Sequence, residues 1–97
     1  MQHLRPSELL RLHRLEALEL LRERGMENPR VFGSVARGTD IAGSDVDLLV
    51  RVPEGRAWDF LGLSEELSDL LGVHVDVVSE AGLKPKHAQL LRDARPL

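Results

Sequence analysis

The sequence contains no cysteine and no tyrosine, and it has only two phenylalanines and one tryptophan. Without cysteine, neither disulfides nor thiolate metal sites can hold the fold, and nothing indicates an oxidising compartment. The scarcity of aromatic residues removes the usual stacking platforms for single-stranded nucleic acid. Acidic residues outnumber basic ones by 16 to 13, so the net charge of -3 supplies no field that would attract nucleic acid or an anionic membrane.

The N-terminal segment carries charges throughout and lacks the uninterrupted apolar run of a signal peptide or membrane span. We therefore expect a cytoplasmic protein with no membrane association and no direct binding to nucleic acid. A chain of 97 residues is long enough for one core, and no linker or repeat divides it. We expect a single domain over residues 1–97.

Hydrophobic periodicity and turn residues predict an alternation of helices and strands. Ser7 is expected to cap the first helix, and Gly25 to end it. The order predicts two layers, a mixed sheet with helices packed on it, of the α+β or α/β kind. The expected helices are 7–24, 58–71 and 86–94, the expected strands are 30–33, 45–52 and 73–79, and one helical turn is expected at 34–37.

Three aspartates lie in segments that otherwise read as hydrophobic strands. Asp45 and Asp47 are two residues apart, so they point to the same side of a strand, with backbones about 6.6 to 6.8 Å apart. Asp76 stands among valines in the next strand. If the two strands are neighbours, the three carboxylates form an oxygen-only site suited to Mg²⁺ or Mn²⁺.

A Gly-Ser pair, Gly33 and Ser34, precedes the predicted helical turn. A residue without Cβ lets a phosphate approach the backbone, and a serine hydroxyl can donate a hydrogen bond to it. Arg37, one turn later, is either a further phosphate contact or a partner in a surface ion pair. Phosphates beside metal-binding carboxylates predict a phosphoryl or nucleotidyl transfer site.

Gly33-Ser34, ten further residues, and then Asp45-x-Asp47 resemble the G-S-x10-D-x-D signature of the DNA polymerase beta superfamily of nucleotidyltransferases. The stretch is most similar to the minimal nucleotidyltransferases (MNT domain), antitoxins often encoded beside a HEPN-domain toxin. The resemblance covers nearly the whole chain in element order and implies an α+β nucleotidyltransferase fold, a small mixed sheet with helices packed on one face.

The resemblance also implies roles for these residues. Gly33 and Ser34 would hold the triphosphate of ATP, and Asp45 and Asp47 would bind Mg²⁺ or Mn²⁺. Asp76 would help to bind one metal ion and activate the acceptor hydroxyl. The implied reaction moves AMP from ATP to a tyrosine of the HEPN ribonuclease and silences it.

Several residues have a simpler interpretation. We expect Asp40 to be a loop residue rather than a ligand, and His74 to be structural. We expect Lys84 and Lys86 to belong to a solvated turn.

Leu12 and Leu15 fall on the charged side of the first helix, which predicts a contact with a partner or with a second copy of the chain. The alternative function is therefore a non-catalytic binding module that neutralises its partner by occlusion through this helix. Transfer to an antibiotic or to a nucleic-acid end is less favoured, because the chain has neither a second domain nor a basic groove.

Overall fold

The computed structural model describes residues 4–85 and 88–97. Within those ranges, no helix has both the length and the apolar character needed to cross a membrane. The elements in chain order are α1 (Pro6–Leu12), α2 (Arg14–Glu23), β1 (Glu27–Phe32), α3 (Gly33–Arg37), β2 (Val46–Arg51), α4 (Ala57–Phe60), α5 (Leu63–Leu71), β3 (Val75–Ser79), the 3-10 turn η1 (Glu80–Gly82), α6 (Ala88–Asp93) and β4 (Arg95–Pro96).

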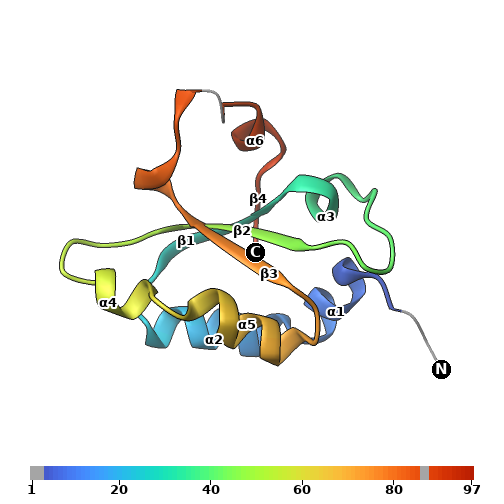
Figure 1. The fold of residues 1–97 in the computed structure, drawn as a ribbon, viewed down its shortest axis with the longest axis horizontal. Helices are drawn as coiled ribbons and strands as arrows, with labels where there is room; N and C mark the ends of the chain where they lie inside the picture. The colour runs from blue at the N-terminus through green and yellow to red at the C-terminus, as the bar shows by residue number, and fades with distance from the viewer. Residues whose placement is uncertain (1–3, 86–87) are drawn as a thin grey trace.

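The strands form one four-stranded sheet in the order β3-β2-β1-β4. β2 and β3 are parallel, and the pairs β1–β2 and β1–β4 are antiparallel. Figure 1 shows α1, α2 and α5 along one face of the sheet, with α3 and α6 on the other side. The predicted α+β fold with a small mixed sheet is confirmed, and α1, α2 and α5 form the expected helical layer on one face, while the short helices α3 and α6 lie on the other (Figure 1).

The core lies between the sheet and the helices α1, α2 and α5. From β2, alternate residues Val46, Leu48 and Val50 point into it, as a strand with period two requires. Leu63 and Leu67 lie on the same face of α5, four residues apart, and pack against the same cluster. The intervening residues of β2 therefore face the opposite side of the sheet, where η1 contacts β2 and α6 contacts β1.

The prediction of one helix over residues 7–24 was wrong. The segment forms α1 and α2, which are separated at His13, where φ is -107° and ψ is 19°. α1 begins at Pro6, because proline suits the first helical position, and Ser7 is therefore not the cap. The backbone N–H of Ser7 instead donates to Oδ2 of Asp40 at 2.8 Å. No glycine or proline marks the break at His13, so the sequence carried no signal for it.

The prediction of one helix over residues 58–71 was also wrong. α4 and α5 are separated at Leu61 and Gly62, and Gly62 adopts a positive φ of 80°, which interrupts a helix. Trp58 on α4 is consequently 83% exposed rather than part of an amphipathic helix.

The ends of other elements differ less from the predictions. β1 begins at Glu27, three residues early, because Asn28 (φ 49°) and Pro29 lie within an irregularity of the strand instead of before it. α6 lies inside the predicted helix 86–94, of which Lys86 is outside the described residues. β4, which was not predicted, has two residues and is too short to leave a periodic pattern.

Candidate active site

The register of the sheet places Asp47 and Asp76 side by side. They are direct partners in the parallel pairing of β2 and β3, and Phe32 is the partner of Asp47 on β1. Partner residues on neighbouring strands, about 4.7 to 4.9 Å apart, project to the same face of the sheet. The expectation that the strand carrying Asp76 adjoins the strand carrying Asp47 is confirmed. Both carboxylates are on the face opposite the helical core.

Asp45 directly precedes β2 at the end of a tight turn. In that turn, the N–H of Ser44 donates to the carbonyl of Ile41 at 2.9 Å, and the hydroxyl of Ser44 accepts from the N–H of Ile41 at 3.0 Å. These two hydrogen bonds close the loop and hold Asp45 next to the first residue of the strand. Asp45 is exposed, whereas Asp47 is half-buried.

The charge environment of Asp47 reflects this grouping of acids. Burial raises the pKa of Asp47, and the carboxylates of Asp76 and Asp45 raise it further, while His74 and Arg37 act in the opposite direction. A bound cation stabilises the charged form of a carboxyl group, and this stabilisation is largest where two acidic neighbours disfavour that form. The electrostatics therefore suit a divalent metal ion.

The donor set suits the same ion. Three carboxylates offer only hard oxygen ligands, which Mg²⁺ and Mn²⁺ prefer. As the side chains are placed, no group of three or more His, Cys, Asp or Glu in residues 4–85 and 88–97 could already hold a metal ion. A cation would therefore bind by drawing Asp45, Asp47 and Asp76 together through side-chain rotation.

Gly33 lies directly against Asp47. It is buried, it has a φ of 71°, and a Cβ built on it would be 2.4 Å from Oδ2 of Asp47. Only glycine allows the backbone to pass this close in this conformation. Ser34 follows in the first turn of α3, a helix that Gly38 ends with a φ of 73°. Gly33 of the predicted Gly-Ser pair thus lies against Asp47, one of the predicted metal ligands.

Arg37, at the end of α3, is exposed and forms an ion pair with Asp93 of α6 at 3.4 Å. Its positive charge also lowers the pKa of Asp47, so it lies within electrostatic reach of the acids. The sequence left open whether Arg37 contacts a phosphate or forms a surface ion pair, and in the structure it forms the ion pair. An exposed pair of this kind contributes about 0 to 1 kcal/mol, so a phosphate could replace Asp93 at little cost.

Asp40 has a structural position. It is 2% exposed, its Oδ2 accepts the hydrogen bond from Ser7, and its Oδ1 has no hydrogen-bond partner among the described residues. Burial raises the pKa of Asp40, but hydrogen bonds from Ser7 and from its own backbone, together with the charge of Arg5, outweigh burial and leave the pKa lowered. Asp40 therefore ties the loop before Asp45 to the beginning of α1.

His74 contributes both to the sheet and to the charge environment of the acids. It is exposed, its carbonyl accepts the N–H of Val46 at 2.9 Å, and its side chain lowers the pKa of Asp47. A backbone role in sheet pairing and an electrostatic effect on the acids thus coincide in one residue.

Two serines of α5 were missed from the sequence. The hydroxyl of Ser68 accepts the N–H of Val75 at 2.8 Å, and the hydroxyl of Ser64 accepts the N–H of Val77 at 3.0 Å. β3 is an edge strand, and these hydroxyls satisfy the outward N–H groups on both sides of Asp76. Serines four residues apart on a leucine-rich helical face were the only available signal.

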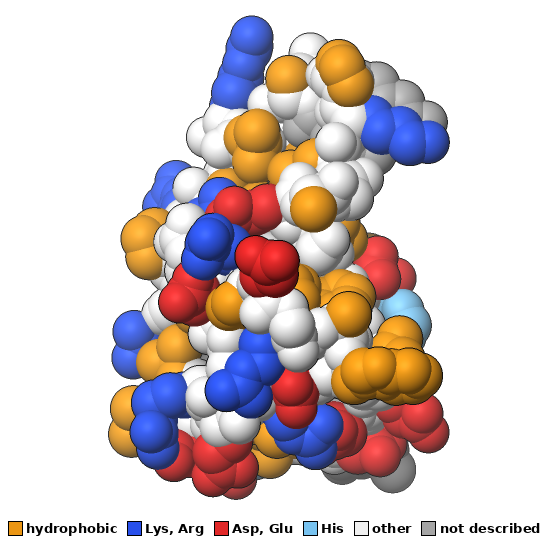
Figure 2. Space-filling model, turned by 90° about the vertical axis from the view of Figure 1, so that its left-hand side faces the viewer, with side chains coloured by type: hydrophobic (Ala, Val, Ile, Leu, Met, Phe, Trp, Pro, Cys, Tyr) orange, Lys and Arg blue, Asp and Glu red, His pale blue; other side chains and the backbone are white. Residues whose placement is uncertain are grey.

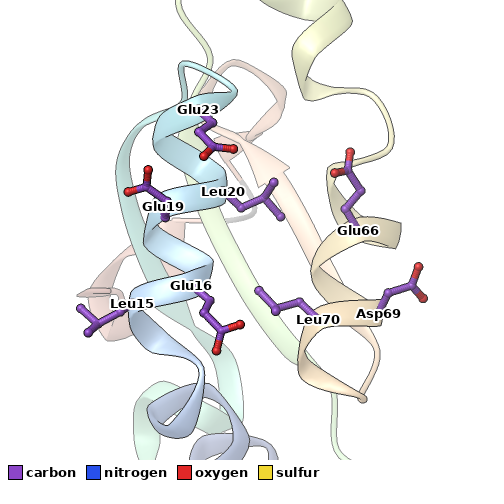
Figure 3. Close-up of a pocket in the computed structure, with 8 residues that line it drawn as sticks. All are labelled: Leu15, Glu16, Glu19, Leu20, Glu23, Glu66, Asp69 and Leu70. Carbon is purple, nitrogen blue, oxygen red and sulfur yellow. The ribbon is translucent and has the colours of Figure 1, made fainter.

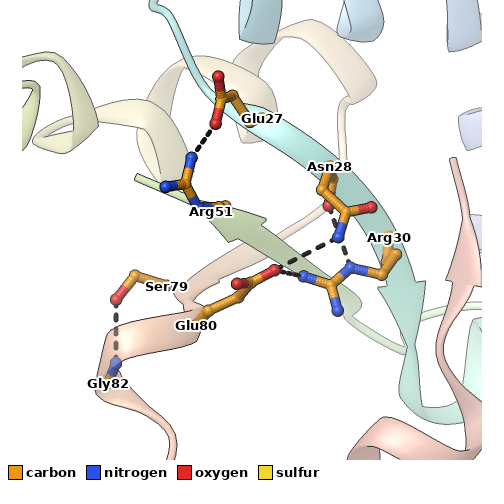
Figure 4. A network of polar contacts seen from close by, with 7 residues as sticks. All are labelled: Glu27, Asn28, Arg30, Arg51, Ser79, Glu80 and Gly82. Carbon is orange, nitrogen blue, oxygen red and sulfur yellow. Dashed lines mark hydrogen bonds and ion pairs between the residues drawn. The ribbon is translucent and has the colours of Figure 1, made fainter. Parts of the chain in front are cut away.

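A cavity lies beside Arg30 and η1, on the face of the sheet that carries Asp47 and Asp76. Arg30 is the partner of Leu49 on β2, and its guanidinium pairs with Glu80 of η1, which also accepts from the amide of Asn28 at 3.4 Å (Figure 4). This network holds η1 over the sheet. The adjoining cavity of about 510 Å³ is lined by Arg30, Glu80, Leu83, Lys84, Pro85, Ala88 and Leu91.

Comparisons with known proteins agree with this geometry. A family model described as a nucleotidyltransferase domain matches residues 16–97. The protein adenylyltransferase MntA of Thermococcus cleftensis is 42% identical over 80 residues, which are 80% of this chain and 77% of that protein. A Methanocaldococcus jannaschii protein provisionally named a protein adenylyltransferase is 35% identical over 77 residues, 78% of each chain.

Solved structures show the same relationship. One, provisionally assigned as a minimal nucleotidyltransferase, has a TM-score of 0.82 and 49% identity, and covers 94% of this chain and 95% of that one. A toxin–antitoxin complex with AMP-PNP has a TM-score of 0.68 and 22% identity, over 84% of this chain and 69% of that one. At that identity, the second likeness shows a common fold alone.

Proposed function

The chain belongs to the nucleotidyltransferase domain family as an adenylyltransferase-type member, and we propose that it moves AMP from ATP to a tyrosine hydroxyl of a cognate HEPN ribonuclease toxin. In this role it acts as the antitoxin, in the cytoplasm. The observation that carries the proposal is the placement of Asp47 beside Asp76, with the backbone of Gly33 directly against Asp47. The relatives named protein adenylyltransferases support a protein as the acceptor.

Each proposed residue has a task that its position allows. Asp45, Asp47 and Asp76 would hold Mg²⁺ or Mn²⁺, which when bound neutralises charge on the triphosphate. The Ser34 hydroxyl would donate to a phosphate oxygen, and Gly33 leaves space for that phosphate beside the backbone. Arg37 would exchange Asp93 for the phosphates and add positive charge.

The transfer itself is a substitution at the α-phosphorus of ATP. Asp76, which is exposed and so within reach of a docked acceptor, would take the proton of the tyrosine hydroxyl. The phenolic oxygen forms a bond to the α-phosphorus as the bond to pyrophosphate breaks. The products are the AMP ester of the toxin and pyrophosphate, which leaves with the displaced electron pair.

Labelled ATP tests the proposal directly. The purified chain, Mg²⁺ and the product of the neighbouring gene should give label on that product, and Asp47→Ala should abolish it. Glu54→Ala, which removes an exposed acid from the loop after β2, is the matched control and should label normally. An unlabelled partner, or equal labelling by Asp47→Ala and the wild type, would remove the proposal.

A second candidate function is neutralisation by occlusion, without catalysis. Leu12 and Leu15 are 67% and 76% exposed, which is unusual for leucine and favours a partner contact. Under this alternative, Leu12→Glu with Leu15→Glu abolishes neutralisation, while Asp45→Asn and Asp47→Asn leave it intact. The opposite pattern favours the enzyme.

Nucleic acid is a less favoured acceptor. Figure 2 shows acidic and basic side chains interspersed over the end of the molecule that carries α4, without a continuous basic surface there. Binding to a nucleic-acid backbone depends on clustered Lys and Arg, and the net charge of -3 opposes it.

A further inference from the structure

A groove lies between α2 and α5, on the helical layer and thus on the other side of the sheet from Asp47. Its volume is about 650 Å³. Leu20 of α2 and Leu70 of α5 point toward each other between the two helices, and Leu15 lines the outer rim of the groove, on the side of α2 away from α5 (Figure 3). Leu15 is the most exposed leucine of the described chain, at 76%. The groove therefore offers apolar contacts that no described residue covers.

The other lining residues of this groove are all acidic: Glu16, Glu19, Glu23, Glu66 and Asp69. Two of these acids have cationic partners, since Arg22 and Arg24 pair with Glu19 and Glu66, and Glu16 is hydrogen-bonded to the His13 ring.

Glu23 and Asp69 form no ion pair within the described residues. No basic residue of the described ranges lines the groove. An apolar strip with an acidic border is complementary to a positively charged, partly apolar ligand.

We propose that this groove binds a Lys- and Arg-rich amphipathic helix of a partner protein. Two helices form its walls, and their backbone groups are already hydrogen-bonded, so there is no strand edge to which an extended peptide could add. A helix presents leucines at i, i+3, i+4 and i+7 to an apolar groove, and its flanking lysines or arginines can reach both acidic borders.

Other occupants fit the charges less well. Phosphate-bearing ligands would be repelled by Glu23 and Asp69, the two lining acids that form no ion pair within the described residues. A second copy that used the same face would bring these acids against their own counterparts, which like-charge repulsion disfavours. The inference goes beyond the proposed AMP transfer, because a groove remote from the aspartates can dock a partner whether or not that partner is modified.

A synthetic helix provides the test. The probe is an 18-residue amphipathic peptide with leucines at that spacing and lysines elsewhere, and the control peptide has glutamates in place of the lysines. The full chain, isotopically labelled, is titrated by amide NMR. We expect saturable shifts in residues 15–23 and 66–70, an affinity that falls as salt is raised, and no saturable binding of the control peptide.

Matched variants assign the binding to the groove. Glu23→Lys should weaken binding at least about tenfold, and Leu15→Ser at least about fivefold. Glu65→Lys, on the outside of α5, and Leu12→Ser, outside the groove, should each change it less than about twofold. All four positions are exposed, so folding should be retained.

Four results would overturn the inference. The first is that the peptide shows no saturable binding, and the second is that the amide shifts centre on residues outside the groove. The third is that Glu23→Lys and Glu65→Lys weaken peptide binding equally. The fourth is a dimer in sedimentation that Leu15→Ser dissociates, because the occupant of the groove would then be a second copy of the chain. The peptide assay contains no nucleotide and no toxin. Its failure would therefore leave the AMP-transfer proposal intact, and failure of the labelling assay would leave the groove assignment intact.

Discussion

Replacing Gly33 by alanine should damage the candidate site far more than the fold. The added Cβ would lie 2.4 Å from Oδ2 of Asp47, but 3.3 Å from its Cγ and 3.5 Å from its Cβ. The carboxylate can therefore rotate away without moving the backbone of β2. The substitution keeps the chain folded and displaces one proposed metal ligand.

The cost to stability comes mainly from the backbone. Gly33 has a φ of 71°, and an L-residue in the left-handed region costs about 1–2 kcal/mol. For a domain of this size, each kcal/mol lowers Tm by about 4–8 °C. The catalytic cost is larger, because misplacing a reacting or binding group by about 1 Å can reduce the rate about 100-fold.

Gly72→Ala is the matched control. Gly72 ends α5 with a φ of 76°, and a Cβ there would meet no atom within 4 Å. Gly72→Ala should lower the free energy of unfolding as much as Gly33→Ala does, while keeping full transfer activity. Thermal unfolding compares the stabilities, calorimetry with Mn²⁺ and ATP compares nucleotide binding, and label transfer compares activity. If Gly33→Ala binds and transfers as well as Gly72→Ala, then the contact between Gly33 and Asp47 does not position the site.

Three further substitutions test the electrostatics and the hydrogen bonds of the described structure. Burial and neighbouring carboxylates raise the pKa of Asp47, so its ionisation destabilises the fold as the pH rises above the ordinary pKa of aspartate. In metal-free buffer, Asp47→Asn should therefore raise Tm at a pH above this range and leave Tm unchanged below about pH 3.9. An equal change in Tm at both pH values would contradict this prediction. Asp40→Ala should cost about 1–2 kcal/mol in urea unfolding, because the N–H of Ser7 loses its acceptor. The lowered pKa of Asp40 also means that wild-type stability falls as pH drops through that pKa, a dependence that Asp40→Ala should lack. Ser68→Ala should cost about 1–3 kcal/mol by leaving the N–H of Val75 unpaired, and an unchanged urea midpoint would count against that hydrogen bond.

The sequence predicted the main strands and the glycine-rich turn well, because these features are local. Period-two alternation in 45–52 and a left-handed glycine at the end of a helical turn each involve only neighbouring residues. The sequence failed where packing decides. The break at His13 has no residue that signals it, and Gly62 within a helical pattern was compatible with a continuous helix until the structure showed its φ of 80°.

The amino-acid order by itself determined that Asp45 and Asp47 face the same way and that Gly33 and Ser34 precede them at a fixed distance along the chain. Only the tertiary structure decided that Asp76 is beside Asp47, because the parallel pairing of β2 and β3 is made across α5 and could have been formed in another register. The same holds for the groove between α2 and α5. Residues far apart in sequence meet there because one sheet face must be covered, and the sequence does not say which helices will lie next to each other.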